Sequence, residues 1–372
     1  MHPDIIVIGA GTVGAAIAYG LARNGLRVLV LDGHDGDYRA ARANFGLVWL
    51  QGKGQNMPAY QELTRCSVNL WPDFDAQLTG LTGTDLQYER NGGLAFCLGE
   101  DAFEKRRLDL QRLHNQLGGA EADWQMLDRS ELGRLLPKIN FGADVTGASF
   151  GCRDGHVNPL RLLSALHAAI VSLGGDLRSN SAVRQIARDG DGFRVTFGSE
   201  HVRAPTLVIA AGLGSQGLAR QVGFDVPLRP LRGQVLVTER LAPFLPLPSS
   251  GLRQTREGTV MIGATHEDAG FDVSATAMAA ADLSRRTVRL VPALADATLV
   301  RQWAGLRIMT PDSGPVYAQS QTHPGAFVAL CHSGVTLAAL HASVLAEAIV
   351  NGELSPSLDA FNQRRFDVSK AA

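Results

Sequence analysis

A glycine-rich turn near the start of the chain has the spacing of a phosphate-binding loop. Gly9, Gly11 and Gly14 follow one another as G-x-G-x-x-G directly after a short apolar run. Gly9 would allow a sharp turn, Gly11 a close approach of backbone to a pyrophosphate, and Gly14 tight packing of a helix on a strand. The free N–H groups of a helix beginning here would face the phosphate charge. The turn therefore predicts a dinucleotide site, with Thr12 and Val13 as further contacts.

The flanking elements complete this unit. Residues 5–8 are typical of a buried parallel strand, residues 13–24 of a helix stopped by Gly25, and residues 27–31 of a second strand that ends at Asp32. The Asp32 carboxylate would accept hydrogen bonds from a ribose hydroxyl. The unit predicts nucleotide binding but does not by itself separate NAD from FAD.

The same glycine spacing recurs at Gly212–Gly217, after the apolar run 206–211. The helix that it opens has only about two turns before Gly223, and a crossover that short would not complete a second nucleotide-binding unit. We interpret the run as a strand that returns to the same sheet. Its end, Ala211 and Gly212, would then lie close to the nucleotide that is already bound.

Four motifs stand in the order found in the D-amino-acid oxidase superfamily of flavoenzymes. They are the N-terminal unit, the strand ending at Gly212, the segment 305–312 and the C-terminal segment 332–336. The resemblance spans nearly the whole chain. It implies non-covalent FAD and an α/β fold, in which a Rossmann-like FAD-binding domain of the glutathione-reductase type carries a second, mostly antiparallel substrate domain.

A finer resemblance lies in residues 44–60, which look similar to the flavin subunits of bacterial opine and D-hydroxyproline dehydrogenases. In the superfamily this segment often reads Ser-x-x-Asn-x-Gly over the flavin ring, and here Ala41 takes the Ser position. The helix expected at 335–349, with Ser333 as its capping residue, would aim its N-terminus at the flavin. The flavin and adenine contacts that the resemblance implies are Asn44, Gly46, Leu47, Val183, Gly305, Ser333, Gly334, Val335 and Thr336.

Arg307 is the strongest candidate for substrate binding. A guanidinium makes two parallel charge-assisted bonds to a carboxylate, and Arg307 matches the carboxylate-binding arginine of the superfamily. His332 lies beside the expected flavin loop and titrates in a useful pH range. These two residues are the predicted catalytic pair. Weaker substrate-binding candidates are Gln51, Lys53, Tyr60 and His266.

The size and composition of the chain limit the number of domains and the kinds of partner that we expect. The chain has 372 residues, a formal net charge of −1 and 45% hydrophobic residues, which suits two packed domains and argues against nucleic-acid binding through a basic surface. We expect an FAD-binding domain from residues 1–80, 150–225 and 305–372, and a substrate domain from residues 81–149 and 226–304.

The sequence also leads us to expect no metal site and no membrane-spanning segment. The four cysteines are far apart, so we predict buried reduced thiols and no metal or iron–sulfur site. The sequence shows no signal peptide and no apolar run long enough to span a membrane, so a cytoplasmic location is expected.

The expected activity is FAD-dependent oxidation of the C–N bond of an amino acid or N-substituted amino acid, with an opine or D-hydroxyproline preferred. One alternative is a glycine, sarcosine or D-amino-acid oxidase that uses oxygen directly. Another, of a different class, is a flavin-carrying scaffold subunit of a complex. A dehydrogenase without cluster ligands of its own would pass its electrons to a partner subunit or carrier.

Overall fold

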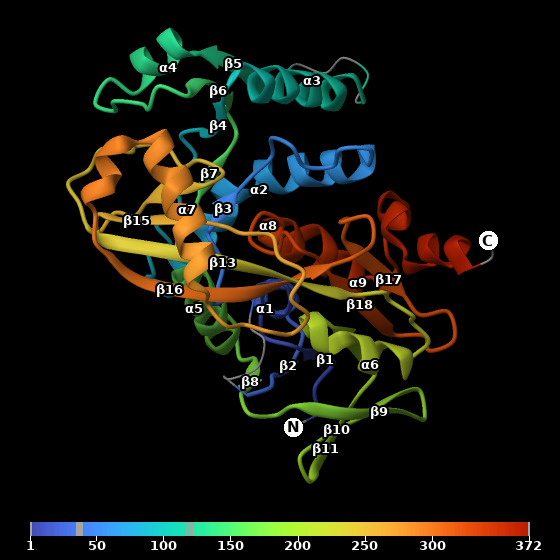
Figure 1. Ribbon diagram of the computed structural model, residues 1–372. Helices are drawn as coiled ribbons and strands as arrows, with labels where there is room; N and C mark the ends of the chain where they lie inside the picture. Colours follow the sequence, from blue (N-terminus) through green and yellow to red (C-terminus); the bar gives the residue numbers. More distant parts are fainter. Residues whose placement is uncertain (1, 35–39, 117, 119–121, 371–372) are drawn as a thin grey trace.

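The computed structural model describes residues 2–34, 40–116, 118 and 122–370. A six-stranded sheet in the order β17-β18-β12-β1-β2-β8 forms its base (Figure 1). All neighbours in it run parallel except the antiparallel pair of β17 and β18. Its strands are β1 (Ile5–Ile8), β2 (Val28–Leu31), β8 (Asp176–Arg178), β12 (Thr206–Ile209), β17 (Val316–Gln319) and β18 (Ala326–Leu330).

Both faces of this sheet are covered, as the continuous apolar strands require. Ile5 and Val7 of β1 pack with helices on one face, whereas Ile6 and Ile8 pack on the other face with a three-stranded antiparallel sheet. The helical side contains α1 (Thr12–Arg23), α2 (Pro58–Thr82), α5 (Pro159–Ser172), α8 (Ala338–Leu340), a π turn (His341–Leu345) and α9 (Ala346–Val350). The opposite side contains β9 (Val183–Asp189), β10 (Gly192–Phe197), β11 (Glu200–Ala204) and α6 (Ser215–Arg220).

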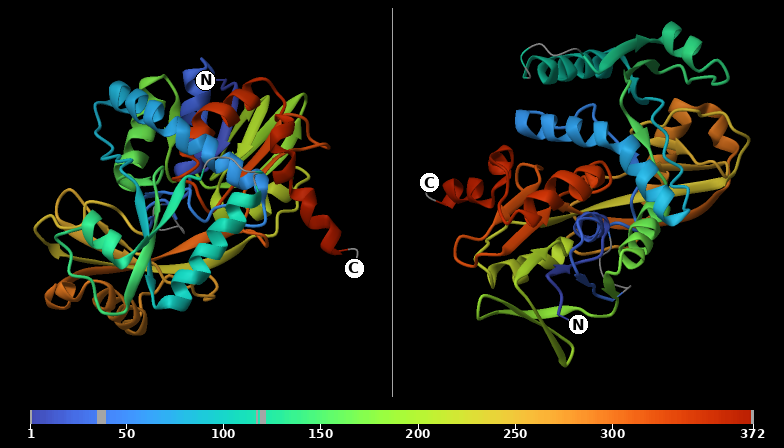
Figure 2. Two further views of the ribbon diagram at one scale, coloured as in Figure 1. Left: turned by 90° about the horizontal axis from the view of Figure 1, so that it is seen from above. Right: turned by 180° about the vertical axis from the view of Figure 1, so that it is seen from behind.

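A second group of antiparallel sheets lies beside the parallel sheet and its helices (Figures 1 and 2). A four-stranded sheet has the order β14-β15-β13-β16, and a three-stranded sheet has the order β4-β6-β5. Buried side chains of β4, β5, β6, β13, β14 and β15 share one apolar core. The elements are β4 (Gly93–Leu98), α3 (Glu100–Gln116), β5 (Trp124–Asp128), α4 (Arg129–Leu135), β6 (Val145–Gly151), β13 (Arg229–Arg240), β14 (Leu252–Gln254), β15 (Thr259–Gly263), α7 (Ala277–Leu290) and β16 (Leu299–Met309).

Two elements connect these parts. The short antiparallel pair of β3 (Leu47–Val48) and β7 (Gly155–His156) joins the segment that precedes α2 to the segment that precedes α5. The long strand β16 continues past residue 304, where we expect a domain boundary, to Met309. Arg307 on β16 is therefore held by the antiparallel sheet, opposite Leu231 of β13.

The predicted fold class is confirmed: a parallel sheet of the Rossmann type is combined with antiparallel sheets. The run 206–209 lies between β1 and β18 in the same sheet, as a returning strand should. Two local predictions were wrong. The C-terminal helical run begins at Ala338, and the Ser333 side chain does not cap it because it bonds other side chains. Of the four cysteines, Cys66 and Cys152 are exposed.

Candidate functional site

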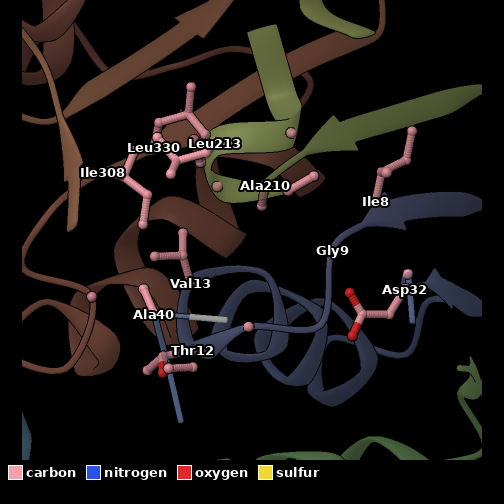
Figure 3. A pocket seen from close by; sticks show the side chains of 18 of the residues that line it. Ile8, Gly9, Thr12, Val13, Asp32, Ala40, Ala210, Leu213, Ile308 and Leu330 are labelled. Carbon is pink, nitrogen blue, oxygen red and sulfur yellow. The ribbon is translucent and has the colours of Figure 1, made fainter. Parts of the chain in front are cut away.

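A cavity of about 380 Å³ opens at the carboxyl ends of the parallel strands (Figure 3). Open α/β sheets bind ligands at this edge because loops and helix N-termini meet there. Asp32 and Ile308 lie on different sides of the cavity in Figure 3, with Thr12 and Val13 between them. The predicted cofactor residues that line it are Gly9, Gly11, Thr12, Val13, Asp32, Asn44, Val183, Ala211, Gly212, Gly334 and Val335.

The glycine turn provides space that a side chain would fill. Gly9 has φ +105°, and a Cβ on Gly14 would lie 2.0 Å from the Gly9 carbonyl oxygen, so this turn cannot form with larger residues. A Cβ on Gly11 would meet no atom of the described residues within 4 Å, and Gly11 itself lines the cavity. The Thr12 hydroxyl is buried and has no hydrogen-bond partner in the described structure. An anionic group held by the N-terminus of α1 would supply that partner.

The other predicted cofactor residues do not line the cavity but pack against the segments that do. A Cβ on Gly46 would lie 2.3 Å from the Val157 carbonyl oxygen, and a Cβ on Gly305 would lie 2.3 Å from the Ala43 side chain. The remaining three hold neighbouring segments: Leu47 pairs with His156 in the β3–β7 ladder, Thr336 accepts a hydrogen bond from Trp49 N, and Ser333 binds two side chains described below.

The sequence prediction missed part of the cavity wall. Ala40, Arg42 and Ile308 line it, as does Ala41 at the position where the superfamily often has Ser. A basic residue such as Arg42 complements a phosphate-bearing ligand. Its position between Ala41 and Asn44, in the segment expected over the flavin, is the sequence signal that could have identified it. Ile308 is brought in by the fold, because β16 reaches the cavity from the antiparallel sheet.

Arg307 has a free hydrogen-bonding edge. Its Nη1 donates to the carbonyl oxygens of Thr265 (2.9 Å) and Arg232 (3.3 Å). Its Nε and Nη2 atoms have no protein acceptor among the described residues. The lack of a side chain at Gly233 makes room for the guanidinium, since a Cβ there would lie within 2.7 Å of it. The Nε–Nη2 edge has the geometry that binds a carboxylate through two parallel bonds.

Basic groups gather around His332, which itself lines the cavity. Burial holds the pKa of His332 well below its ordinary value, and the nearby charges of Lys53, Arg307 and His266 lower that pKa further. Burial also lowers the pKa of Arg307 and of His266. The imidazole of His332 is therefore neutral at neutral pH, among groups that together carry excess positive charge.

Lys53 and Tyr60 meet at Ser333. The Lys53 Nζ donates to Ser333 Oγ at 2.8 Å, and the Tyr60 hydroxyl is 2.7 Å from the same oxygen. Burial lowers the pKa of Lys53 to about 8 and raises the pKa of Tyr60 above its ordinary value. This link joins the start of α2 to the loop that lines the cavity. Sequence analysis named all three residues without indicating that they touch.

Gln51 lies apart from this group. Its amide oxygen accepts from Arg106 Nη2 (2.7 Å) and Ser149 Oγ (2.6 Å), and its amide nitrogen donates to the Gly93 carbonyl oxygen. The structure thus places Gln51 in a buried polar network that joins α3 to β6. Asp154, in the same region, accepts hydrogen bonds from Leu50 N and Gln51 N.

Comparisons with known proteins identify the family. The model of the DAO family of FAD-dependent oxidoreductases matches residues 4–348. The chain belongs to the DAO family. One of its relatives is a subunit of the opine oxidase of Agrobacterium tumefaciens (strain Ach5), which is 41% identical over 369 residues that cover 99% of each chain. Hydrogen cyanide synthase subunit HcnC of Pseudomonas aeruginosa is 30% identical, covering 99% of this chain and 97% of that one.

Solved structures of DAO-family enzymes agree with this assignment. The crystal structure of glycine oxidase from Geobacillus kaustophilus superposes with a TM-score of 0.89 at 25% identity, covering 98% of this chain and 99% of the other. FAD is the cofactor of this family. The glycine turn, the unpartnered Thr12 hydroxyl and the cavity at the strand ends fit its pyrophosphate. Among the described helices, none combines the length and apolar character that a membrane crossing needs.

Proposed function

We propose that this DAO-family protein oxidises the C–N bond of an amino acid or N-substituted amino acid, with opines and D-hydroxyproline as the preferred substrates. The observation that carries the proposal is the free Nε–Nη2 edge of Arg307, which stands close to the cavity-lining His332. When bound, FAD supplies an acceptor for a hydride from the substrate Cα, which leaves an imine that water hydrolyses. The protein residues bind and orient the donor.

In this proposal Arg307 binds the substrate carboxylate and thereby fixes the position of Cα. The positive charges of Arg307 and Lys53 make a protonated amine unfavourable, so they favour the neutral amine that oxidation requires. His332 is neutral and partly exposed at the cavity wall, where it can accept a hydrogen bond from the amine N–H.

The electron acceptor is the second part of the proposal. Two of the relatives are named as subunits of larger enzymes: one belongs to an opine oxidase and the other to a hydrogen cyanide synthase. This favours a dehydrogenase that passes electrons to a partner subunit over an oxidase that uses oxygen directly.

Anaerobic bleaching of the flavin band tests the activity. We expect the purified holoprotein to bleach with at least one of octopine, nopaline, D-hydroxyproline, D-proline, glycine and sarcosine. Admitting air afterwards separates the acceptors: slow recolouring supports a partner subunit, whereas fast recolouring with peroxide supports the oxidase alternative. If none of these amines bleaches the flavin, the proposed activity is wrong and the scaffold alternative stands.

A further inference from the structure

Two cations near His332 lack an acidic partner. Within the described residues, neither Lys53 nor Arg307 forms a salt bridge; Lys53 bonds a neutral hydroxyl and Arg307 bonds backbone carbonyls. They come from different parts of the fold, the loop before α2 and strand β16. Both are close enough to His332 to affect its ionisation. A buried charge without a counter-ion is costly, so a ligand that brings negative charge would be favoured at each position.

The nearest acids are already occupied. Glu267 accepts hydrogen bonds from Arg232 and Gln234, so it acts on Arg307 only through its charge and not through a hydrogen bond. Asp154 receives two backbone N–H groups, and burial raises its pKa to about 7, so it offers Lys53 less than a full negative charge near neutral pH. In the part of the chain that the structure describes, no carboxylate therefore pairs directly with either cation.

A hydrogen bond fixes the position of the Lys53 ammonium, and some of its N–H donors have no acceptor among the described residues. Ser333 Oγ takes one of the three N–H donors of the ammonium, and Tyr60 holds Ser333 from the other side. Nζ makes no other hydrogen bond within the described part of the chain, so two donors remain. This arrangement suits a binding group better than a residue whose only role is to anchor a loop.

We propose that Lys53 binds the second carboxylate of those donors that are secondary amines with one carboxylate on each side of the nitrogen. Arg307 takes the carboxylate next to the oxidised Cα, and Lys53 takes the carboxylate of the N-substituent. This proposal rests on the proposed function, because it adds a specificity-determining residue to the same site.

Iminodiacetate and sarcosine form a matched pair of probes. Each is a secondary amine with a carboxymethyl group, and they differ in whether the other N-substituent ends in a carboxylate. Their dissociation constants are measured with the holoprotein by the shift of the flavin spectrum or by calorimetry. Binding is thus read separately from bleaching, and failure of the proposed activity is distinguishable from failure of the Lys53 assignment.

Lys53→Met should weaken iminodiacetate binding by roughly 10- to 100-fold, as expected for a lost charged hydrogen bond, and leave sarcosine within about twofold. Lys53→Arg should restore most of the difference, because it keeps the positive charge. The control is Lys105→Met, since Lys105 is exposed on α3 and pairs with Asp109. Equal weakening of both probes would show a purely structural role for Lys53 and overturn the proposal.

A second comparison covers the case in which Lys53→Met does not fold or loses FAD. Wild-type protein should bind iminodiacetate at least roughly 10-fold more tightly than its monomethyl ester, which lacks one negative charge but keeps nearly the same shape. Equal affinity for the diacid and the monoester would likewise refute a second carboxylate site.

Discussion

Replacing Arg307 with Met would remove the group that we place on the substrate carboxylate while keeping an unbranched side chain in place of its aliphatic stem. The guanidinium is partly buried, and its Nε–Nη2 edge has no protein acceptor among the described residues. Losing one partner of such a charge pair costs about 2–4 kcal/mol. At 1.36 kcal/mol per tenfold change, kcat/KM for a carboxylate-bearing amine should fall about 30- to 900-fold.

The assay compares two substrates with two proteins. The first substrate is the amine that bleaches the flavin fastest, and the second is its primary amide, which has no negative charge. We expect Arg307→Met to reduce kcat/KM strongly for the acid but only slightly for the amide, while the protein keeps its FAD. Such a cycle isolates the interaction between the guanidinium and the carboxylate.

Arg301→Met is the matched control. Residues 301 and 307 lie six positions apart on β16 and so point to the same face of the strand, but Arg301 is exposed and stacks over Trp303. Its replacement should leave kcat/KM unchanged. The reasoning is refuted if Arg307→Met retains wild-type kcat/KM for the acid, or if acid and amide lose the same factor.

Three further predictions concern the cofactor turn, Lys53 and Asp154. The Gly11→Val variant should purify without flavin colour and should unfold at the same temperature as the FAD-free wild type. The Gly14→Ala variant should unfold at a lower temperature, because its Cβ would meet the Gly9 carbonyl oxygen at 2.0 Å. The ratio of iminodiacetate to sarcosine affinity should fall as pH rises above about 8, because burial lowers the Lys53 pKa to that value and the ammonium is then lost. Asp154→Asn should be at least as stable as wild type at pH 8, measured by urea unfolding.

The pH dependence of the free energy of unfolding follows from the difference between the folded and unfolded pKa of Asp154. Burial raises its folded-state pKa from 3.8 to about 7, so between those values the folded protein holds a proton that the unfolded chain has lost. The wild-type free energy of unfolding should therefore fall as pH rises through this window, by on the order of 1 kcal/mol per pH unit from this group. Asn cannot ionise, and its amide oxygen can still accept from Leu50 N and Gln51 N.

Each of these predictions has a contradicting result. A yellow Gly11→Val protein would show that the pyrophosphate does not lie beside this glycine. An affinity ratio that is flat from pH 7 to 10 would remove Lys53 from the dicarboxylate site. A wild-type stability that does not fall between pH 4 and 7, relative to Asp154→Asn, would show that the Asp154 carboxyl is not buried as described.

The fold and the cofactor turn could be predicted because their signals are local. Gly9, Gly11, Gly14 and Asp32 lie within one short strand–helix–strand unit, and the spacing dictates how they meet. The returning strand could also be predicted, since the helix after Gly212 is too short for a separate unit.

The contacts around the basic cluster could not be predicted, because they join distant segments. Lys53 and Ser333 are 280 positions apart, and their hydrogen bond depends on how α2 packs beside the C-terminal loop. The buried partners of Gln51 include Arg106 on α3, which no sequence pattern connects to it. Ile308 enters the cavity wall for the same reason, since tertiary packing brings it there, whereas Arg42 lies between Ala41 and Asn44 in a segment that the sequence already places at the flavin.

Transfer of a hydride from the substrate Cα is the central claim, and one measurement tests it directly. The purified holoprotein is mixed anaerobically with an N-substituted amino acid, in its ordinary form and with deuterium at Cα, and the loss of the flavin band is followed with time. We predict complete bleaching by both, with a slower rate for the deuterated compound. Bleaching at equal rates would contradict Cα–H cleavage as the slow step of reduction, and no bleaching by any carboxylate-bearing amine would contradict the proposed function itself.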